Sequence, residues 1–236
     1  MYLYYLFSES SEWTNLDEAL LSYVSEERRQ KIHAYKFSKD KKLSLYAALL
    51  LPYACADQYD LAFEEVDPLW PQAGKPYLQS HPEICFSIAH SGSCAAVAVS
   101  DQEIGLDAEL IDKAPMKIMK RVFSPNEADR VHGSAYPDLE FFRIWTRKES
   151  FGKYLGTGLS TLVLKTDTFL PEHLSRISEG VLTPQDFYSR SEYLTMRKTS
   201  DPELPALYYS VYGKKEQVNL VPVSVTTLLE YYLLYI

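Results

Sequence analysis

The spacing of hydrophobic residues changes along the chain, and each change marks a predicted element. An apolar and aromatic run over residues 1–7 predicts a first strand. A helix is predicted to begin at Ser25, a capping residue that precedes two acids. A second helix is predicted from Ser38, and we expect Pro52 to end it because proline cannot donate the helical hydrogen bond. Residues 68–76 are rich in turn-forming residues.

Between residues 84 and 110 the pattern has the period of two that is typical of strands. Three strands are predicted at 84–89, 94–99 and 104–110, with a turn at 90–93 between the first two. Strands this close in sequence commonly pair with their neighbours, so the pattern predicts an antiparallel meander.

Helical spacing returns in the second half of the chain. An amphipathic segment at 116–123 precedes a helix start at Ser124, where proline occupies the first helical position. A longer helix is predicted to begin after Pro137 and to end at Gly156, a residue type common at helix C-termini. A strand is expected at 162–169.

The last part of the chain predicts a hairpin. Strands at 206–212 and 217–225 flank Gly213 and two lysines. Residues 170–201 have no regular period, and the tail at 226–236 fits either a helix or a strand.

The order of these elements predicts the α/β (α+β) class. Strand, helices and meander are followed by helices, strand and hairpin, which indicates two similar α/β halves at 1–103 and 104–236. The sequence contains no internal repeat that relates the two halves. No stretch between them has the composition of a flexible linker, so the halves are expected to pack against each other.

Composition and charge indicate which kinds of partner the protein binds. The chain has 236 residues, 46% of them hydrophobic, and a net charge of −8 from 24 basic and 32 acidic residues. This acidic balance argues against a nucleic-acid binder. Basic residues cluster at 28–42 and at 113–121, a pattern that suits a phosphate-bearing ligand or an acidic protein partner.

The cysteines and the N-terminus point to the cytoplasm. Cys55, Cys85 and Cys94 lie in or near apolar runs without zinc-site spacing, so reduced, packed thiols are expected. The apolar segment at 1–7 has no basic flank and is too short for a signal or membrane helix, so no membrane association is expected.

Two acids lie on one side of the predicted strand at 104–110. Alternation places Asp107 and Glu109 together on one face, roughly 6–7 Å apart, opposite an apolar face. Gly105 lies on the acidic face, where a missing side chain leaves room for a ligand. Two such carboxylates are either a solvated edge or a site for Mg²⁺, which binds one or two carboxylates plus phosphate oxygens.

The long helix carries a second charged group. Residues four apart share a face, so Phe141, Trp145, Glu149 and Lys153 form one row. Its last two members are either a surface ion pair on an amphipathic helix or partners of the acids on the strand.

Four motifs together resemble a known family. Residues 104–109 and 145–153, preceded by Gly74-Lys75-Pro76 and Ala89-His90-Ser91-Gly92, resemble the signature of the Sfp-type 4′-phosphopantetheinyl transferases. The resemblance covers about residues 74–160. It implies a pseudo-twofold fold and transfer of the phosphopantetheine arm of coenzyme A to a serine of an acyl, peptidyl or polyketide carrier protein, with release of adenosine 3′,5′-bisphosphate.

The resemblance also implies a metal site and a base. Asp107, Glu109 and Glu149 would hold Mg²⁺ against the pyrophosphate. Glu149 would accept the proton of the carrier serine, directly or through water. Lys153 would neutralise charge on the leaving phosphate.

Contacts to coenzyme A follow from the same resemblance. Lys148 and His90 would contact phosphates, Lys75 the nucleotide end, and Lys31 with its basic neighbours the 3′-phosphate.

Three departures from the family pattern are present, and in one of them Leu106 and Ala108 replace the commoner isoleucine or valine on the core face. Ala89 stands where serine is frequent. Ser44 replaces a frequent basic residue, so contacts to the 3′-phosphate would shift to Lys41 or Lys42.

The family also implies a surface for the carrier protein. Met116, Met119, Arg121 and Phe123 would dock the carrier, although an ordinary amphipathic segment packed on the core explains the same pattern. A monomer is expected. The alternatives are a non-catalytic protein that binds carriers or nucleotides, and another Mg²⁺-dependent phosphodiester enzyme.

Overall fold

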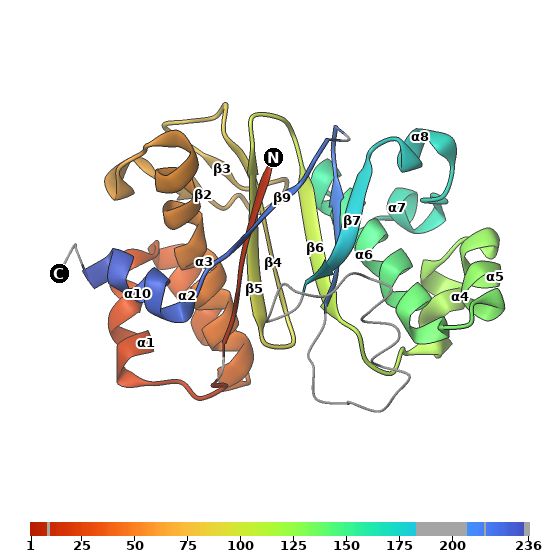
Figure 1. Ribbon diagram of the computed structural model, residues 1–236, viewed down its shortest axis with the longest axis horizontal. Coiled ribbons are helices and arrows are strands. Elements are labelled where there is room, and N and C mark those ends of the chain that lie inside the picture. The colour runs from red at the N-terminus through yellow and green to blue at the C-terminus, as the bar shows by residue number, and fades with distance from the viewer. Residues whose placement is uncertain (9, 183–206, 215, 234–236) are drawn as a thin grey trace.

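Two β-sheets lie back to back at the centre of the molecule, and helices cover both outer sides (Figure 1). The computed structural model describes residues 1–8, 10–182, 207–214 and 216–233. The helices are α1 (Asn15–Leu20), α2 (Glu26–Ala34), α3 (Ser38–Tyr59), α4 (Met119–Val122), α5 (Pro125–Gly133), α6 (Pro137–Leu155), α7 (Thr161–Lys165), α8 (Pro171–Leu174) and α10 (Val225–Leu233). The strands are β1 (Tyr2–Phe7), β2 (Pro68–Leu69), β3 (Tyr77–Leu78), β4 (Cys85–Ser91), β5 (Cys94–Ser100), β6 (Gly105–Leu110), β7 (Ile177–Leu182), β8 (Leu207–Tyr212) and β9 (Asn219–Pro222). The predicted α/β class is confirmed.

The two sheets differ in strand direction. The first has the order β4-β5-β1-β9, in which β1 is antiparallel to β5 and parallel to β9. The second has the order β6-β8-β7 and is antiparallel throughout. Strands β2 and β3 form a separate small ribbon.

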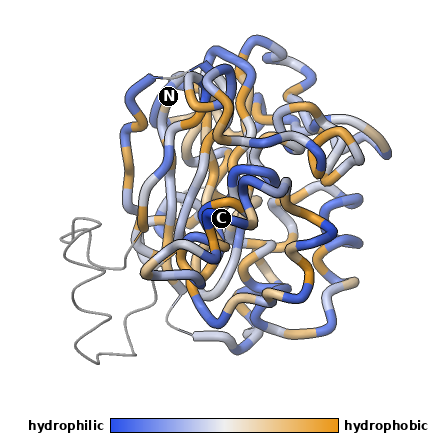
Figure 2. Tube along the Cα trace, turned by 90° about the vertical axis from the view of Figure 1, so that its right-hand side faces the viewer, coloured by the Kyte–Doolittle hydropathy of each residue, from blue (hydrophilic) through white to orange (hydrophobic). Residues whose placement is uncertain are grey.

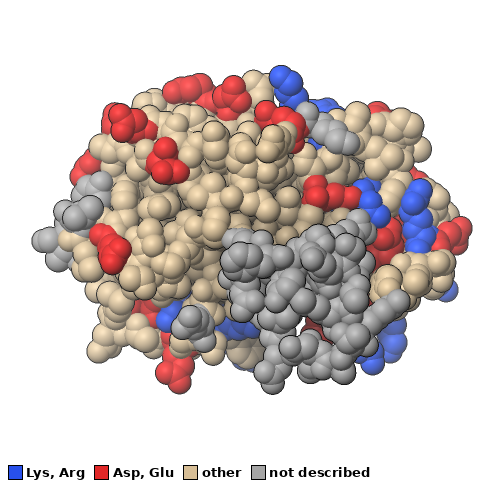
Figure 3. All heavy atoms as spheres, viewed as in Figure 1, with Lys and Arg blue, Asp and Glu red and all other residues tan. Residues whose placement is uncertain are grey.

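Alternation along each strand produces the layers. In β1, Tyr4 and Leu6 belong to the core shared with α3, whereas Leu3 and Tyr5 belong to the core between the sheets. Hydrophobic positions accordingly run through the interior strands in Figure 2, and hydrophilic positions mark many of the outer turns. Acidic side chains are scattered over the face in Figure 3, while several lysines and arginines lie toward the end formed by α4 to α8.

Strand β6 follows the same rule, and it places the acids. Leu106 and Ala108 belong to the core between the sheets. Gly105 and Asp107 face α6 instead, where Asp107 contacts Lys153. The predicted two faces are therefore confirmed.

Gly105 makes room for backbone and not for a ligand, contrary to the prediction. A Cβ atom at this position would lie 2.1 Å from the carbonyl oxygen of Ser150 and 2.4 Å from the backbone nitrogen of Tyr154. Helix α6 therefore packs directly on the strand because residue 105 has no side chain.

The edge strands of the two sheets, β4 and β6, are joined through serine hydroxyls. The backbone N–H of Leu106 donates to Ser87 Oγ at 2.9 Å, and that of Leu110 donates to Ser91 Oγ at 3.1 Å. These bonds satisfy backbone donors that no strand ladder uses.

Several boundaries agree with the predicted helix signals. Ser25 accepts from the N–H of Arg28, Ser124 forms a capping box with Glu127, and Gly156 ends α6 with a φ of 68°.

Helix α3 runs through Pro52, so the predicted stop is wrong. Leu49, Leu50 and Leu51 before the proline and Ala54 after it are buried in the same core. Burial of both halves of the helix offsets the one hydrogen bond that proline removes, a loss of about 3 kcal/mol.

Three strand predictions are wrong in their partners or their type. Residues 162–169 contain α7, which Ser160 caps, instead of a strand. The third strand of the predicted meander, β6, pairs with β8 in the other sheet instead of with β5. The predicted hairpin is also absent, because β9 pairs with β1 and not with β8. The turn predicted at 90–93 begins two residues later in the structure, since β4 extends to Ser91.

The end of the chain returns to the first half. Leu228 and Tyr232 of α10 are buried in the core of α3, and the Tyr232 hydroxyl donates to the carbonyl oxygen of Leu49 at 2.7 Å. The predicted C-terminal half, 104–236, therefore does not keep its last strand and helix.

Cys55, Cys85 and Cys94 are free thiols. Within the described residues, no helix has the length and apolar character needed to cross a membrane.

We predict that Gly105→Ala destabilises the protein by about 3 kcal/mol, because α6 must move away from β6. Chemical unfolding followed by circular dichroism measures the free energy of unfolding. Gly133→Ala is the matched control, since a Cβ there meets nothing within 4 Å. Equal free energies of unfolding for the two variants would contradict the packing argument.

Candidate active site

Asp107 is the centre of an acidic cluster between β6 and α6. The residue is 6% exposed, and Oδ1 accepts from Lys153 Nζ at 2.8 Å. The other oxygen, Oδ2, is buried without a hydrogen-bond partner. Burial raises the pKa of Asp107, and Lys153 opposes that shift. One oxygen of this carboxylate therefore lacks the positive partner that a buried acid needs.

Glu109 lies on the same face of the strand. Its Oε2 accepts from the hydroxyl of Ser91 at 2.6 Å. Burial raises the pKa of Glu109, and the neighbouring charge of Asp107 raises it further.

Glu149 reaches the cluster from α6. Burial, and then the charge of Asp107, raises the pKa of Glu149 to about 7. Lys153 lies one turn further along the helix but makes its ion pair with Asp107 instead of Glu149. The alternative prediction for this helix, a surface ion pair between Glu149 and Lys153, is therefore wrong.

A line of basic side chains continues from Lys153 to α2. Burial, and then the charges of Arg28 and Lys153, lowers the pKa of His90 to about 4. Burial lowers the pKa of Lys31, and the same two cations lower it further. His90 Nε2 lies 3.2 Å from the hydroxyl of Tyr35. The predicted ligand contacts His90 and Lys31 thus share one electropositive region with Lys153.

Arg28 belongs to this region, and sequence reasoning did not single it out. It is 5% exposed, donates to the carbonyl oxygen of Ser44 at 3.0 Å, and has no carboxylate among the ion pairs of the described residues. Its Nε and the hydroxyl of Ser44 are both buried without a partner. Burial lowers the pKa of Arg28 to about 10, so it remains a cation at neutral pH. The three-residue spacing of Arg28 and Lys31 on one helix was the signal for this pair.

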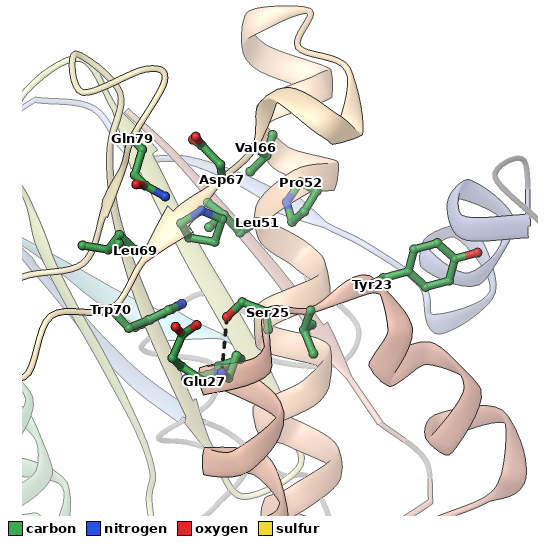
Figure 4. Close-up of a pocket in the computed structure, with 14 residues that line it drawn as sticks. Tyr23, Ser25, Glu27, Leu51, Pro52, Val66, Asp67, Leu69, Trp70 and Gln79 are labelled. Atoms are coloured by element: carbon green, nitrogen blue, oxygen red, sulfur yellow. Dashed lines mark hydrogen bonds between the residues drawn. The ribbon is translucent and has the colours of Figure 1, made fainter.

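Arg28 is also among the residues that line a cavity of about 380 Å³. Figure 4 shows this cavity with Trp70, Leu51 and Val66 in its walls. It lies between α2, α3 and β2, with Leu51, Pro52 and Val66 among its apolar walls. The Arg28 guanidinium lies 4.8 Å from the ring centroid of Trp70, which also lines the cavity. None of the three acids lines this space, so the cavity is separate from the acidic cluster.

Lys148 does not face the cluster, which corrects its predicted contact with a phosphate. It is fully buried and forms an ion pair of 2.9 Å with Glu127. It also donates to the carbonyl oxygens of Val163, Leu164 and Thr166. A lysine held in this way stabilises the helices around it and has no free N–H for a ligand.

Lys75 connects the Gly-Lys-Pro turn to the second half. It donates to the carbonyl oxygen of Ile104 at 2.8 Å and forms an ion pair with Glu103. Its backbone also lies against Gly156 at the end of α6. The described contacts of Lys75 are therefore with protein groups beside the acidic strand.

The two lysines suggested as substitutes at Ser44 are already engaged. Lys42 forms a buried ion pair of 3.1 Å with Asp17. Lys41 lies 3.8 Å from the ring centroid of Trp13. Both point to α1 and its preceding loop, so Arg28 is the cation that lies at Ser44.

The predicted docking segment is only partly exposed. Met119 and Phe123 are 4% and 7% exposed and pack in the core of the second half, so they are not available to a partner. Met116 is half-buried and Arg121 is exposed. The alternative, an ordinary amphipathic segment packed on the core, is confirmed for Met119 and Phe123.

The three acids supply the negative charge that a divalent cation requires, but their side chains do not form a complete set of metal ligands. In the portion of the chain with described coordinates, no three His, Cys, Asp or Glu side chains converge as a ready-made metal site. However, Asp107 Oδ2 has no partner, and burial raises the pKa of all three acids. A cation beside them would supply the missing positive charge.

Comparison with known proteins matches both halves of the chain to one family. Residues 103–207 match the 4′-phosphopantetheinyl transferase superfamily, and residues 10–102 match the 4′-phosphopantetheinyl transferase N-terminal model.

Individual relatives agree with these family models. The chain is 33% identical over 156 residues to a 4′-phosphopantetheinyl transferase of Bacillus subtilis, a match that covers 65% of this chain and 68% of the relative. It is 31% identical to the 4′-phosphopantetheinyl transferase Sfp of Bacillus subtilis strain 168, with the same coverage. It is 28% identical to the L-aminoadipate-semialdehyde dehydrogenase-phosphopantetheinyl transferase of Xenopus laevis, over 58% of this chain and 50% of the relative.

We predict that Glu149→Gln stabilises the folded protein above pH 7. The pKa of Glu149 is raised from 4.5 to about 7, so the folded state keeps a proton that the unfolded state releases. This contribution to stability is complete below about pH 4.5 and is lost as the pH rises to about 7. Glutamine cannot ionise, and we expect a gain of about 1–2 kcal/mol at pH 8, reduced by partial exposure.

Thermal unfolding at pH 4.5 and pH 8 measures this effect. Glu64→Gln, at an exposed position, is the control. The explanation fails if Glu149→Gln and the wild type unfold at the same temperature at pH 8.

Proposed function

The chain belongs to the Sfp-type 4′-phosphopantetheinyl transferase family, and from that premise we propose that it transfers the 4′-phosphopantetheine arm of coenzyme A to a serine of an apo carrier protein. The observation that carries the proposal is the meeting of Asp107 and Glu109 on β6 with Glu149 and Lys153 on α6. This grouping supplies acids for a metal, a base and a cation within one site.

Asp107, Glu109 and Glu149 would hold Mg²⁺. The unpartnered Oδ2 of Asp107 supports this assignment, as does the raised pKa of all three acids. When bound, Mg²⁺ would reduce the negative charge of the pyrophosphate.

Glu149 is the proposed base. The serine oxygen of the carrier forms a bond to the β-phosphorus of coenzyme A, and the serine proton passes to the Glu149 carboxylate, directly or through water. The bond between that phosphorus and the bridging oxygen breaks, and adenosine 3′,5′-bisphosphate leaves with the bonding electrons. A pKa of about 7 lets Glu149 accept a proton near neutral pH. Lys153 would neutralise the leaving phosphate, for which it must share its charge with Asp107.

Arg28, Lys31 and the hydroxyl of Ser44 are proposed to hold the 3′-phosphate. Arg28 Nε and Ser44 Oγ are buried donors without partners, and Lys31 adds a second cation on the same helix. A phosphate at this position would supply the missing acceptor. His90 is influenced by the charges of both Arg28 and Lys153, so it is proposed to contact the pyrophosphate.

The carrier would dock on the exposed part of the segment before α5. Lys117, Lys120 and Arg121 are exposed there beside the half-buried Met116. Acidic carriers with an apolar stripe complement such a surface.

We predict that Asp107→Ala lowers the rate of transfer by about a thousandfold, because it removes a proposed metal ligand and the partner of Lys153. The assay combines apo carrier, coenzyme A and Mg²⁺, and intact mass reports the phosphopantetheine adduct. Asp101→Ala, at an exposed acid in the turn before β6, is the control. Wild-type turnover in Asp107→Ala would show that the metal site is misassigned. If the wild type modifies none of several acyl and peptidyl carriers, the transferase proposal itself is wrong.

We predict that Arg28→Gln raises KM for coenzyme A by about 10- to 100-fold, the effect of losing a charged hydrogen bond. The variant should use 3′-dephospho-coenzyme A almost as well as the wild type does, because that substrate lacks the phosphate in question. Arg29→Gln is the control, since Arg29 bonds the carbonyl oxygen of Val24 and Glu26 instead. An equal loss with both substrates would assign Arg28 a structural role.

A further inference from the structure

Ser91 makes a contact that the proposed function does not use. It is the last residue of β4, in the first sheet, whereas the acids lie on β6 in the second. Its hydroxyl accepts from the N–H of Leu110 at 3.1 Å and donates to Glu109 Oε2 at 2.6 Å. A residue from one sheet thus holds a proposed metal-binding carboxylate of the other.

The two bonds of Ser91 fix the direction of its hydroxyl. The N–H of Leu110 occupies a lone pair of Oγ, so the single hydroxyl hydrogen is free to point to Glu109. A 2.6 Å contact to a carboxylate is in the range of charge-assisted hydrogen bonds. The orientation of Glu109 is therefore imposed by a group that is itself attached to the neighbouring residue of β6.

Ser87 shows what the connection between the sheets requires by itself. It lies four residues before Ser91 on β4, and its hydroxyl accepts from the N–H of Leu106 at 2.9 Å. Its described hydrogen bonds include no carboxylate. Joining β4 to β6 accounts for Ser87 completely, but it does not account for the bond from Ser91 to Glu109.

Glu109 needs this support more than an exposed acid does. Glu109 is half-buried, and a glutamate side chain loses rotamer freedom when it is fixed. The bond from Ser91 therefore holds the carboxylate from the side of β4.

We propose that Ser91 is a positioning residue: through Glu109 it sets the affinity of the site for a divalent cation and ties that affinity to the docking of the two sheets. The inference rests on the proposed metal site. Residues that orient metal ligands commonly change metal affinity by about tenfold or more when they are lost.

The test measures the binding of Mn²⁺ in place of Mg²⁺, by electron paramagnetic resonance, to the full chain with saturating coenzyme A. Ser91→Ala should weaken Mn²⁺ binding about tenfold. It should also raise KM for Mg²⁺, with KM for the carrier unchanged. Ser91→Thr keeps the hydroxyl and should restore most of the affinity. Ser87→Ala is the matched control: it removes a connection between the sheets and should lower the melting temperature while leaving Mn²⁺ affinity at the wild-type value.

The outcomes separate this inference from the proposed function. Equal Mn²⁺ affinity in Ser91→Ala and the wild type overturns the positioning role but leaves the metal site intact. An equal loss in Ser91→Ala and Ser87→Ala also overturns it, because the effect would then come from sheet docking alone. If the wild type with coenzyme A binds no Mn²⁺, the metal site fails, and the inference fails with it.

Discussion

The close approach of α6 to β6 is the constraint on which the site depends. Gly105 allows it, since a Cβ there would overlap the backbone at Ser150 and Tyr154. The periodicity of side chains along the strand and along the helix then determines which residues meet across the contact. The strand turns alternate side chains toward the helix, which brings Asp107, and the helix presents residues one turn apart, which brings Glu149 and Lys153. A wider separation would let water between these charges and weaken their mutual influence. The raised pKa of Glu149 is a direct result of this proximity and of burial.

This arrangement places function and stability in opposition. Buried Asp107 and half-buried Glu109 and Glu149 share one cation, Lys153, whose ion pair is with Asp107. Buried carboxylates without full compensation destabilise the folded state as they ionise. Arg28 of α2 lacks a negative partner in the same way, because it is a buried cation without a carboxylate among the described ion pairs. A ligand that is anionic at one end and binds a divalent cation at the other would relieve both, and this is the charge distribution of the proposed coenzyme A complex with magnesium.

Sequence periodicity predicted the parts of this site that depend on local geometry. The two faces of β6, the cap at Ser25 and the end of α6 at Gly156 all follow from residue type and spacing. Sheet partners were not predictable in the same way, because strand pairing is made by backbone groups that carry no residue signal. Hence β6 and β9 were assigned to the wrong neighbours. Lys148 illustrates a different limit. It is adjacent to Glu149 in sequence, yet about 100° around the helix, and this rotation takes it to a different face of α6, where it meets Glu127.

The site is also assembled across the two sheets, and this ties its geometry to the fold as a whole. Lys153 donates to the carbonyl oxygen of Ile88 on β4 at 3.3 Å, while Lys75 of the first half bonds Ile104 beside β6. Ser91 completes the set by holding Glu109. Each of these bonds joins a group next to the acids to the other half of the chain, so separating the sheets would release Glu109 and Lys153 from these partners. Because β9 returns to pair with β1, the chain itself closes the two sheets together. The docking of the sheets is therefore part of the proposed catalytic geometry.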